Sequence, residues 1–485
     1  MKTTSNLMIA NVSRRSFLQG VVASSALVLA ARWDFATASE EEPKYGAEGM
    51  PNGWVDNPNV FISIDKDGTV TFTNHRAEMG QGIRTSLAMV AADELGADWQ
   101  RVKVTQAPGD EKRFGNQNTD GSRSMRHWYN PMRRAAAAAR TMLEQTAAKQ
   151  WDADVSDCVA GVHQVEHTPT GRTLGFGELA MAARDMAVPD RNSLVLKSSD
   201  QHRYIGKDSG PSQGVKTADI QRPKAIDGED IVTGKAIYGA DVILDNMLYA
   251  VIARPPVYGA AVASVDDSAA LKVPGVEKVI SLPAASQPSA FAPLGGVAVV
   301  ATNTWAALEG RRALKIEWNL EPAGDNANYE SDSYRKSLEE ASRSAGKVIR
   351  SSGDIEQAFR DADKQIDATY YMPHMAQSPM EPPVAVVRVA DGKVEAWAPV
   401  QHPQLTRDAL AGMLELDAEN VTVNVTLLGG GFGRKSKPDF VLEAGALAAQ
   451  MDGRPVRVQW SREDDLHHSF FHSVSVDRLE GALDK

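Results

Sequence analysis

Cysteine is nearly absent from this sequence, because Cys158 is the only one among 485 residues. A single thiol cannot form a disulfide within the chain. It also cannot supply the set of thiolates that a cysteine-ligated zinc site or an iron–sulfur cluster needs. If the protein carries out redox chemistry, its electrons must therefore leave through another polypeptide or a soluble acceptor.

A membrane-spanning apolar run and an excess of positive charge are also missing. The apolar stretch at residues 17–30 is shorter than the roughly 20 residues that a transmembrane helix needs. Acidic residues outnumber basic ones by 63 to 52, which gives a net charge of −11 and does not favour binding to a phosphate backbone. We therefore expect no transmembrane anchor and no nucleic-acid partner.

The N-terminal segment has the pattern of an export signal. Arg14-Arg15 precedes the apolar run, and Ala36-Thr37-Ala38 follows it as a cleavage pattern. The arrangement resembles the twin-arginine signal, whose route carries folded proteins and so hints at a cofactor inserted before export. We expect residues 1–38 to be this signal, residues 39–59 to be a linker, and the protein to be periplasmic.

The rest of the composition is that of a globular protein, with 42% apolar and 24% charged residues over a length typical of about three domains. Residues 61–64 and 69–73 alternate around a turn and predict a β-hairpin. A glycine-rich turn opens an apolar helix within residues 79–97, and an alanine-rich helix is expected over 131–151. From residue 227 to about 318, strand patterns with short helices predict a separate small α+β domain.

The most specific motif is Leu428–Lys435, which reads LGGGFGRK between a strand and a helix. Consecutive glycines let the backbone approach a ligand closely and leave N–H groups free to bind an anion. The motif is neither a dinucleotide fingerprint nor a P-loop. A tight strand–helix connection would give the same local pattern.

Several segments together resemble the molybdenum hydroxylases, the xanthine dehydrogenase/aldehyde oxidase family. The matching segments occur in the order of the isoquinoline 1-oxidoreductase beta-subunit type. They are MGQG at residues 79–82, TDGSRS at 119–124, DGEDIVTGKAIYGAD at 227–241, MEPPVAVV at 380–387, APVQHP at 398–403, GGGFGRK at 429–435 and WSREDDLHHSFF at 460–471.

The resemblance implies a multidomain α+β fold with a small hammerhead-like α/β domain between cofactor-binding α+β domains. Residues 60–215 would be the N-terminal molybdopterin-binding segment, and residues 220–320 the hammerhead domain. Residues 340–485 would be a second molybdopterin-binding domain, incomplete at its C-terminus.

The resemblance also assigns cofactor-binding residues in each motif. They are Gly80, Gln81, Gly82, Ser122, Ser124, Gln401, Gly431, Phe432, Gly433 and Arg434. On local pattern alone, Gln81 could instead satisfy a helix end and Gln401 could be a solvated loop residue. Ser122 and Ser124 could be simple N-caps of the helix expected at residue 131.

No catalytic residue is assigned. The family carries its catalytic base, a glutamate, in a Gly-x-Gly-Glu segment near the C-terminus, and no such segment follows the glycine loop here. The base role is not transferred to Glu381, Glu443 or Glu463. His374, His402, His467 and His468 lack a trusted metal-ligand spacing and are expected to be structural or surface residues. No metal ligand is expected directly from the protein.

By resemblance, the chain is the cofactor-binding part of an oxidoreductase that hydroxylates an N-heteroaromatic compound or an aldehyde with oxygen from water. The implied cofactor is molybdenum–molybdopterin, with the cytosine dinucleotide form as one option. The implied partners are a small [2Fe–2S] subunit, a cytochrome-type acceptor and a separate chain that supplies the missing C-terminal part. The alternatives are an exported, inert truncated product and a cofactor-free binding module. The substrate and the oligomeric state do not follow from the sequence.

Export should depend on the twin arginines, since the translocation receptor recognises paired guanidinium groups that lysine does not reproduce. In the double variant Arg14→Lys, Arg15→Lys, we expect the protein to stay in the cytoplasm. Cell fractionation and immunoblotting measure this. Undiminished periplasmic protein would show that the segment is not a twin-arginine signal.

Overall fold

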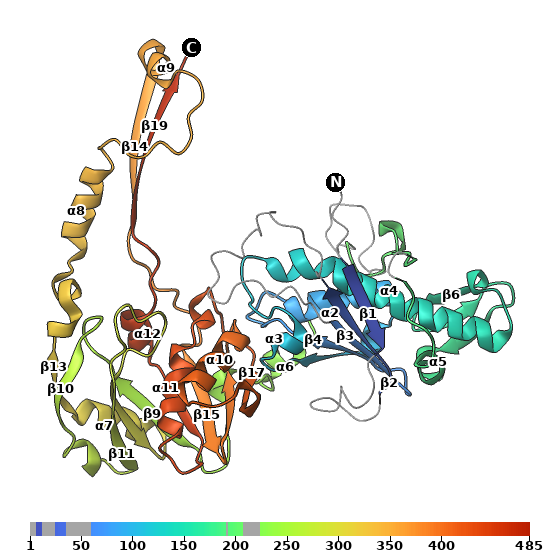
Figure 1. Ribbon diagram of the computed structural model, residues 1–485, viewed down its shortest axis with the longest axis horizontal. Coiled ribbons are helices and arrows are strands. Elements are labelled where there is room, and N and C mark those ends of the chain that lie inside the picture. The colour runs from blue at the N-terminus through green and yellow to red at the C-terminus, as the bar shows by residue number, and fades with distance from the viewer. Residues whose placement is uncertain (1–5, 12–24, 35–59, 191–192, 207–223) are drawn as a thin grey trace. The chain divides into compact units, whose positions relative to one another are not determined.

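The computed structural model describes residues 6–11, 25–34, 60–190, 193–206 and 224–485 (Figure 1). The chain divides into two compact units. The first comprises residues 1–247 and 384–457, and the second comprises residues 248–383 and 458–485. Helices and strands are mixed in both units, which confirms the predicted α+β class. The predicted domain boundaries stay predictions.

The first unit begins with a five-stranded sheet in the order β1–β2–β3–β4–β5. These strands are β1 (Asn6–Asn11), β2 (Ser25–Asp34), β3 (Val60–Asp65), β4 (Val70–Asn74) and β5 (Val102–Gln106). β3 and β4 form the predicted antiparallel hairpin, whereas β4 and β5 run parallel. The parallel pairing requires a crossover connection, which α2 (Ile83–Leu95) provides.

Two of these strands fall within the range assigned to the signal sequence. β2 pairs antiparallel with β3, and Leu27 is buried in the core. Cleavage after Ala38 would remove β1 and β2 and leave β3 at the edge of the sheet. Arg14-Arg15, Ala36-Thr37-Ala38 and the linker at 39–59 lie outside the described residues, so export stays a prediction.

The alanine-rich helix α4 (Arg123–Trp151) ends where predicted but begins earlier than Pro131. Pro131 lies inside the helix, although a proline removes one backbone hydrogen bond there. Trp128 and Met132 on either side of Pro131 are buried. This packing outweighs the local preference that placed the helix start at the proline.

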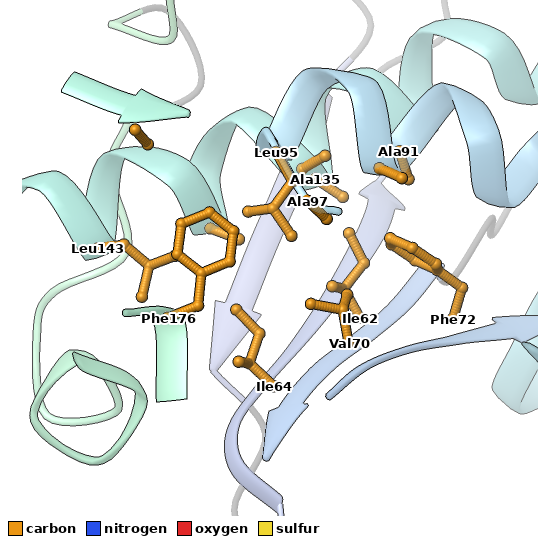
Figure 2. Packing of buried hydrophobic residues seen from close by; sticks show 14 of the residues in the cluster. Ile62, Ile64, Val70, Phe72, Ala91, Leu95, Ala97, Ala135, Leu143 and Phe176 are labelled. Atoms are coloured by element: carbon orange, nitrogen blue, oxygen red, sulfur yellow. The ribbon is translucent and has the colours of Figure 1, made fainter. Parts of the chain in front are cut away.

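The core of the N-terminal part lies between this sheet and its helices (Figure 2). Ala135–Ala139 of α4 are all fully buried, and their small side chains allow α4 to pack closely against α2. Apolar side chains of β3 and β4 face α2, α4 and α5 (Phe176–Ala183) across this core. The labelled members are Ile62, Ile64, Val70, Phe72, Ala91, Leu95, Ala97, Ala135, Leu143 and Phe176.

The remainder of the first unit repeats the same parallel arrangement. β15 (Val384–Ala390) and β16 (Lys393–Ala398) form an antiparallel hairpin, and β16 then pairs parallel with β17 (Val421–Val425). The crossover helix is α10 (Pro403–Met413). Other elements of the unit are α3 (Glu111–Phe114), β6 (Cys158–Gly161), β7 (Gln164–His167), β8 (Arg172–Gly175), α6 (Gly228–Thr233) and α11 (Asp439–Ala448). β18 (Val456–Gln459) runs across the division between the units.

The second unit contains the antiparallel strands β9 (Leu248–Ala253), β12 (Gly296–Ala301) and β11 (Val276–Leu282). Helix α7 (Thr304–Ala313) packs against β9 and β12 through a small core that includes Val251 and Ala307. The unit also contains β10 (Ala261–Asp266), β13 (Lys315–Asn319), α8 (Ser331–Ala341), α9 (Ile355–Asp361), β14 (Lys364–Met372), α12 (Arg462–His468) and β19 (Ser475–Leu483). In the part of the chain that the structure describes, no helix is long and apolar enough to cross a bilayer.

Candidate cofactor site

Four loops of the first unit follow the carboxyl ends of its parallel strands. β4 leads into residues 75–82, β5 into 107–122 (which include α3), β16 into 399–402 and β17 into 426–433. The carboxyl ends of parallel strands are where open α/β sheets bind ligands. The sequence-predicted site residues lie in these four loops or, for Ser124 and Arg434, in the first turn that follows them.

Gln401 joins the second of these loops to the fourth. Its side chain is buried, with Nε2 donating to the Thr119 carbonyl at 2.9 Å and Oε1 accepting from the Gly433 N–H at 3.0 Å. Its backbone adds two more links, since it accepts from the Thr119 N–H and donates to the Lys435 carbonyl. Gln401 is therefore not a solvated loop residue. Both ends of its amide form hydrogen bonds with backbone groups.

The glycine loop fits closely against these neighbours. A Cβ atom on Gly431 would stand 2.5 Å from Gln401 Oε1 and 2.8 Å from Met79 Sδ, so no larger residue fits without displacing them. Phe432 has a φ of 51° and is 69% exposed, and Gly433 has a φ of 87°. The left-handed backbone thus turns Phe432 outward, while Gly431 packs inward against Gln401 and Met79.

Arg434 is fully buried, and its guanidinium forms a two-pronged ion pair with Asp439 at 2.8 and 2.7 Å. A bidentate pair of this kind fixes the geometry of the arginine. Asp439 therefore balances the positive charge of Arg434, and contact of Arg434 with the cofactor stays a prediction.

Glu78 organises the first loop and was not identified from the sequence. Its buried carboxylate accepts from the N–H groups of Gly80 and Gly82 at 2.9 Å each and from that of Arg84 at 3.0 Å. A carboxylate at this position caps the positive end of α2. The sequence signal that could have identified Glu78 is its position directly before the MGQG segment, which leads into α2.

Gln81 is exposed and bonded within its own turn. Its Oε1 accepts from the Met79 N–H at 2.7 Å, and its Nε2 donates to the Ala77 carbonyl at 2.9 Å. These contacts match the alternative that the local pattern left open, in which Gln81 hydrogen-bonds to backbone groups at the start of a helix. Contact of Gln81 with a pterin stays a prediction.

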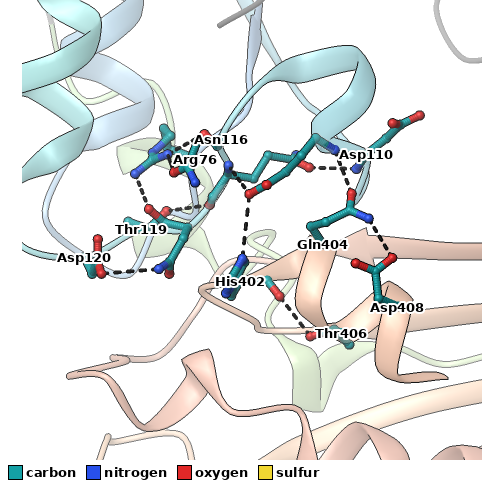
Figure 3. Close-up of polar contacts among 12 residues, drawn as sticks. Arg76, Asp110, Asn116, Thr119, Asp120, His402, Gln404, Thr406 and Asp408 are labelled. Atoms are coloured by element: carbon teal, nitrogen blue, oxygen red, sulfur yellow. Dashed lines mark hydrogen bonds and ion pairs between the residues drawn. The ribbon is translucent and has the colours of Figure 1, made fainter. Parts of the chain in front are cut away.

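The fully buried Arg76 links the first loop to the second (Figure 3). Its Nε donates to Ser124 Oγ at 2.9 Å, and its Nη1 donates to Asn116 Oδ1 at 3.0 Å and to a backbone carbonyl. Burial lowers the pKa of Arg76 to about 9, so the guanidinium is still charged at neutral pH. The hydroxyl of Ser124 is thus engaged by Arg76.

Ser122 differs from Ser124, because it is exposed and makes no side-chain capping bond. Its φ of 57° places it in the left-handed region at the first position before α4. The simple N-capping role is therefore not the one the structure gives to Ser122.

Another polar contact ties the second loop to α10 (Figure 3). His402 is buried, and its Nε2 lies 3.7 Å from Glu111 Oε1. The same carboxylate oxygen accepts from the Gln117 N–H at 2.8 Å, and the Glu111 N–H donates to Gln404 Oε1 at 2.7 Å. His402 is therefore buried beside a carboxylate, and the structural or surface role expected for it stays a prediction. Among the described residues, no cluster of three or more His, Cys, Asp or Glu could hold a metal ion.

The base role stays unassigned for the other carboxylates named above. Glu443 is buried inside α11, and Glu381 and Glu463 belong to the second unit. A Gly-x-Gly-Glu sequence does occur upstream, at residues 175–178, but Glu178 accepts from the Gly175 N–H at 2.6 Å and caps α5 at the surface. The structure thus assigns the base role to none of these residues.

The glycine turns of these loops leave open space beside the backbone, which a cofactor would need. Among the described residues, and apart from its neighbours in the chain, nothing lies within 4 Å of a Cβ atom built on Gly80, Gly82, Gly121 or Gly433. These turns therefore present open backbone, with the exposed Ser122 and Phe432 next to two of them. The arrangement fits a flat, polar ligand that is held along the backbone, as a pterin is.

The chain matches the molybdopterin cofactor-binding domain over residues 43–218 and again over residues 339–485. It is 32% identical to isoquinoline 1-oxidoreductase subunit beta of Brevundimonas diminuta, over 90% of this chain and 58% of that protein. It is 31% identical to the membrane-bound aldehyde dehydrogenase (pyrroloquinoline-quinone) of Gluconacetobacter polyoxogenes, over 98% of this chain and 59% of that protein. The chain belongs to the molybdenum hydroxylase family, which confirms the resemblance drawn from its motifs.

The chain spans less than two thirds of the length of these two relatives. Among solved structures, it is similar to quinoline 2-oxidoreductase from Pseudomonas putida 86 with a TM-score of 0.41 and 21% identity. That match covers 53% of this chain and 36% of the other.

Replacing Gln401 should loosen the second and fourth loops together. In Gln401→Ala, the Thr119 carbonyl and the Gly433 N–H lose a buried partner, which costs about 1–3 kcal/mol. We expect the Gly433 amide to exchange with deuterium about 5- to 100-fold faster, as measured by NMR or mass spectrometry. Gln81→Ala is the matched control, because its amide also bridges two backbone groups but is exposed. Equal effects in the two variants would show that burial of Gln401 is not what holds the loops.

Proposed function

We propose that this chain is the molybdenum-cofactor-binding part of an oxidoreductase that hydroxylates an N-heteroaromatic compound or an aldehyde, with water as the source of oxygen. The observation that carries the proposal is the buried Gln401 amide, which bonds backbone of two motif-bearing loops. The names of the two relatives support both substrate classes, because one is an isoquinoline enzyme and the other an aldehyde enzyme.

When bound, the cofactor supplies the metal centre that activates water and accepts a hydride equivalent from the substrate. The work of this chain is then to hold and orient the cofactor. The open backbone at Gly80, Gly82 and Gly433 would let it approach, and the exposed Phe432 ring next to Gly433 would be available to contact it. Glu78 and Arg76 hold these loops in place through hydrogen bonds from their buried side chains. We include the cytosine dinucleotide form of the cofactor in this proposal as one option.

Electron transfer requires partners in this proposal. The two electrons taken from the substrate cannot pass to a cluster in this chain, because Cys158 alone cannot ligate one. A small [2Fe–2S] subunit would accept them, followed by a cytochrome-type acceptor. The relative from Brevundimonas diminuta is named as subunit beta, which supports an assembly of several chains. We further propose that the assembly is periplasmic, on the basis of the twin arginines.

We predict that the 485-residue chain does not turn over alone. No general base is assigned within it, and the loss of a general base typically lowers a rate by about 10²–10⁴-fold. The test is dye-linked oxidation of quinoline, isoquinoline and aromatic aldehydes by protein purified from its own host. The assay is run with and without the polypeptide encoded downstream of position 485.

Comparable activity in both preparations would refute this prediction and direct attention to Glu381, Glu443 and Glu463. Activity in neither preparation, with every component present, would favour an inert product or a cofactor-free binding module.

A further inference from the structure

A small cavity lies where β4 ends and the first loop, residues 75–82, begins. Its walls come from β4, β5, α2 and α4, and most of them are apolar side chains. Three polar residues, Asn74, His75 and Arg84, also line it. The space open to a water-sized sphere is about 10 Å³, which is room for one water molecule.

Each of these three residues has a buried polar atom that needs a partner. The atoms are Asn74 Oδ1, His75 Nε2 and Arg84 Nε, and among the described residues none of them has a hydrogen-bond partner. Buried polar atoms without a partner are rare in folded proteins. Three residues with such atoms around one cavity therefore indicate a ligand that hydrogen-bonds to them.

The hydrogen-bonding character of two of these atoms is fixed. Asn74 Nδ2 donates to Gln106 Oε1 at 2.8 Å and to the Arg76 carbonyl, so Oδ1 is left as an acceptor. Arg84 Nε can only donate. The other guanidinium nitrogens of Arg84 are engaged, since Nη1 pairs with Asp227 at 3.2 Å and Nη2 donates to the Val104 carbonyl at 3.2 Å.

His75 adds a third atom, which can donate or accept. Its side chain is buried, and its ring contacts that of Trp128 with 3.8 Å between the centroids. Burial, together with the neighbouring charge of Arg76, holds the pKa of His75 well below its usual value. The imidazole is therefore neutral at neutral pH, and Nε2 is a donor in one tautomer and an acceptor in the other.

The ligand must therefore donate to Asn74 Oδ1, accept from Arg84 Nε and suit either tautomer of His75. An inorganic anion such as chloride has no proton to donate to Asn74. A metal cation would face the guanidinium of Arg84, whose charge Asp227 already balances. Water satisfies all three atoms, and a buried water typically makes about three hydrogen bonds.

We propose that one water molecule is bound in this cavity and bridges Asn74, His75 and Arg84. The bridge joins the end of β4 to α2 and, through the pair of Arg84 with Asp227, to the start of α6. The water thus supports the first loop from the side of the core. No cofactor contact enters this inference, so it does not rest on the proposed function.

A crystal structure of the native protein, purified from its own host, tests the site. We expect an ordered water within about 2.7–3.2 Å of all three atoms. Absence of density there, or a His75 ring that pairs with protein atoms instead, would overturn the proposal. A bromide soak separates water from an anion, because an anomalous bromide signal at this position would also overturn it.

Hydrogen–deuterium exchange tests the support that the water gives. His75→Phe keeps a ring against Trp128 but removes Nε2, and we expect residues 75–82 to exchange about 2- to 12-fold faster. His202→Phe is the matched control, because His202 Nε2 is likewise buried without a partner among the described residues, but His202 does not line this cavity. Equal acceleration in the two variants would contradict the bridge.

Ala88→Val provides a second test that leaves all three polar residues in place. Ala88 of α2 lines the cavity, so the added methyl groups would displace the water. Exchange of residues 75–82 should again become faster, and unchanged exchange in a crystal-verified, water-free variant would overturn the supporting role. Circular dichroism and thermal unfolding show whether each variant is folded. None of these measurements depends on molybdenum, so a metal-free preparation would contradict the proposed function and leave this inference standing.

Discussion

The arrangement of the candidate site depends on one buried amide, that of Gln401. Its donor end holds the Thr119 carbonyl and its acceptor end holds the Gly433 N–H, so two loops far apart in the sequence are fixed by a single side chain. The bond to Thr119 is buried and the bond from Gly433 is partly buried. A buried polar group that loses its partner costs more free energy than an exposed one. Gly431 lies close to the same amide, so a larger residue at position 431 would displace the Gln401 side chain.

Other charged groups hold the loops around this amide. Glu78 binds three N–H groups at the start of α2, Arg76 holds Ser124 and Asn116, and Arg434 is fixed by Asp439. Each is a buried charge with a partner of opposite charge or with several hydrogen bonds, as burial requires. The consequence is that many motif side chains support the loops, while the open space lies along the glycine backbone and beside Phe432.

Much of the fold could be predicted from the sequence, whereas the cofactor-binding roles of the site residues stay predictions. Alternation gave the β3–β4 hairpin, and the glycine turn before α2 and the LGGGFGRK motif located two of the loops. The start of α4 could not be predicted, because packing around Pro131 overrides its local preference. The roles of Glu78 and of the Gln401 amide also depend on contacts between distant segments, which periodicity and spacing do not encode.

The central claim is that these loops form the binding site of a molybdenum–pterin cofactor. The most direct measurement is the molybdenum and pterin content of the protein purified from its own host, compared between the native sequence and Gln401→Ala. The account predicts about one molybdenum and one pterin per native chain and a clear loss of both in Gln401→Ala. A well-folded native preparation that contains neither, or that carries a quinone in their place, would contradict it.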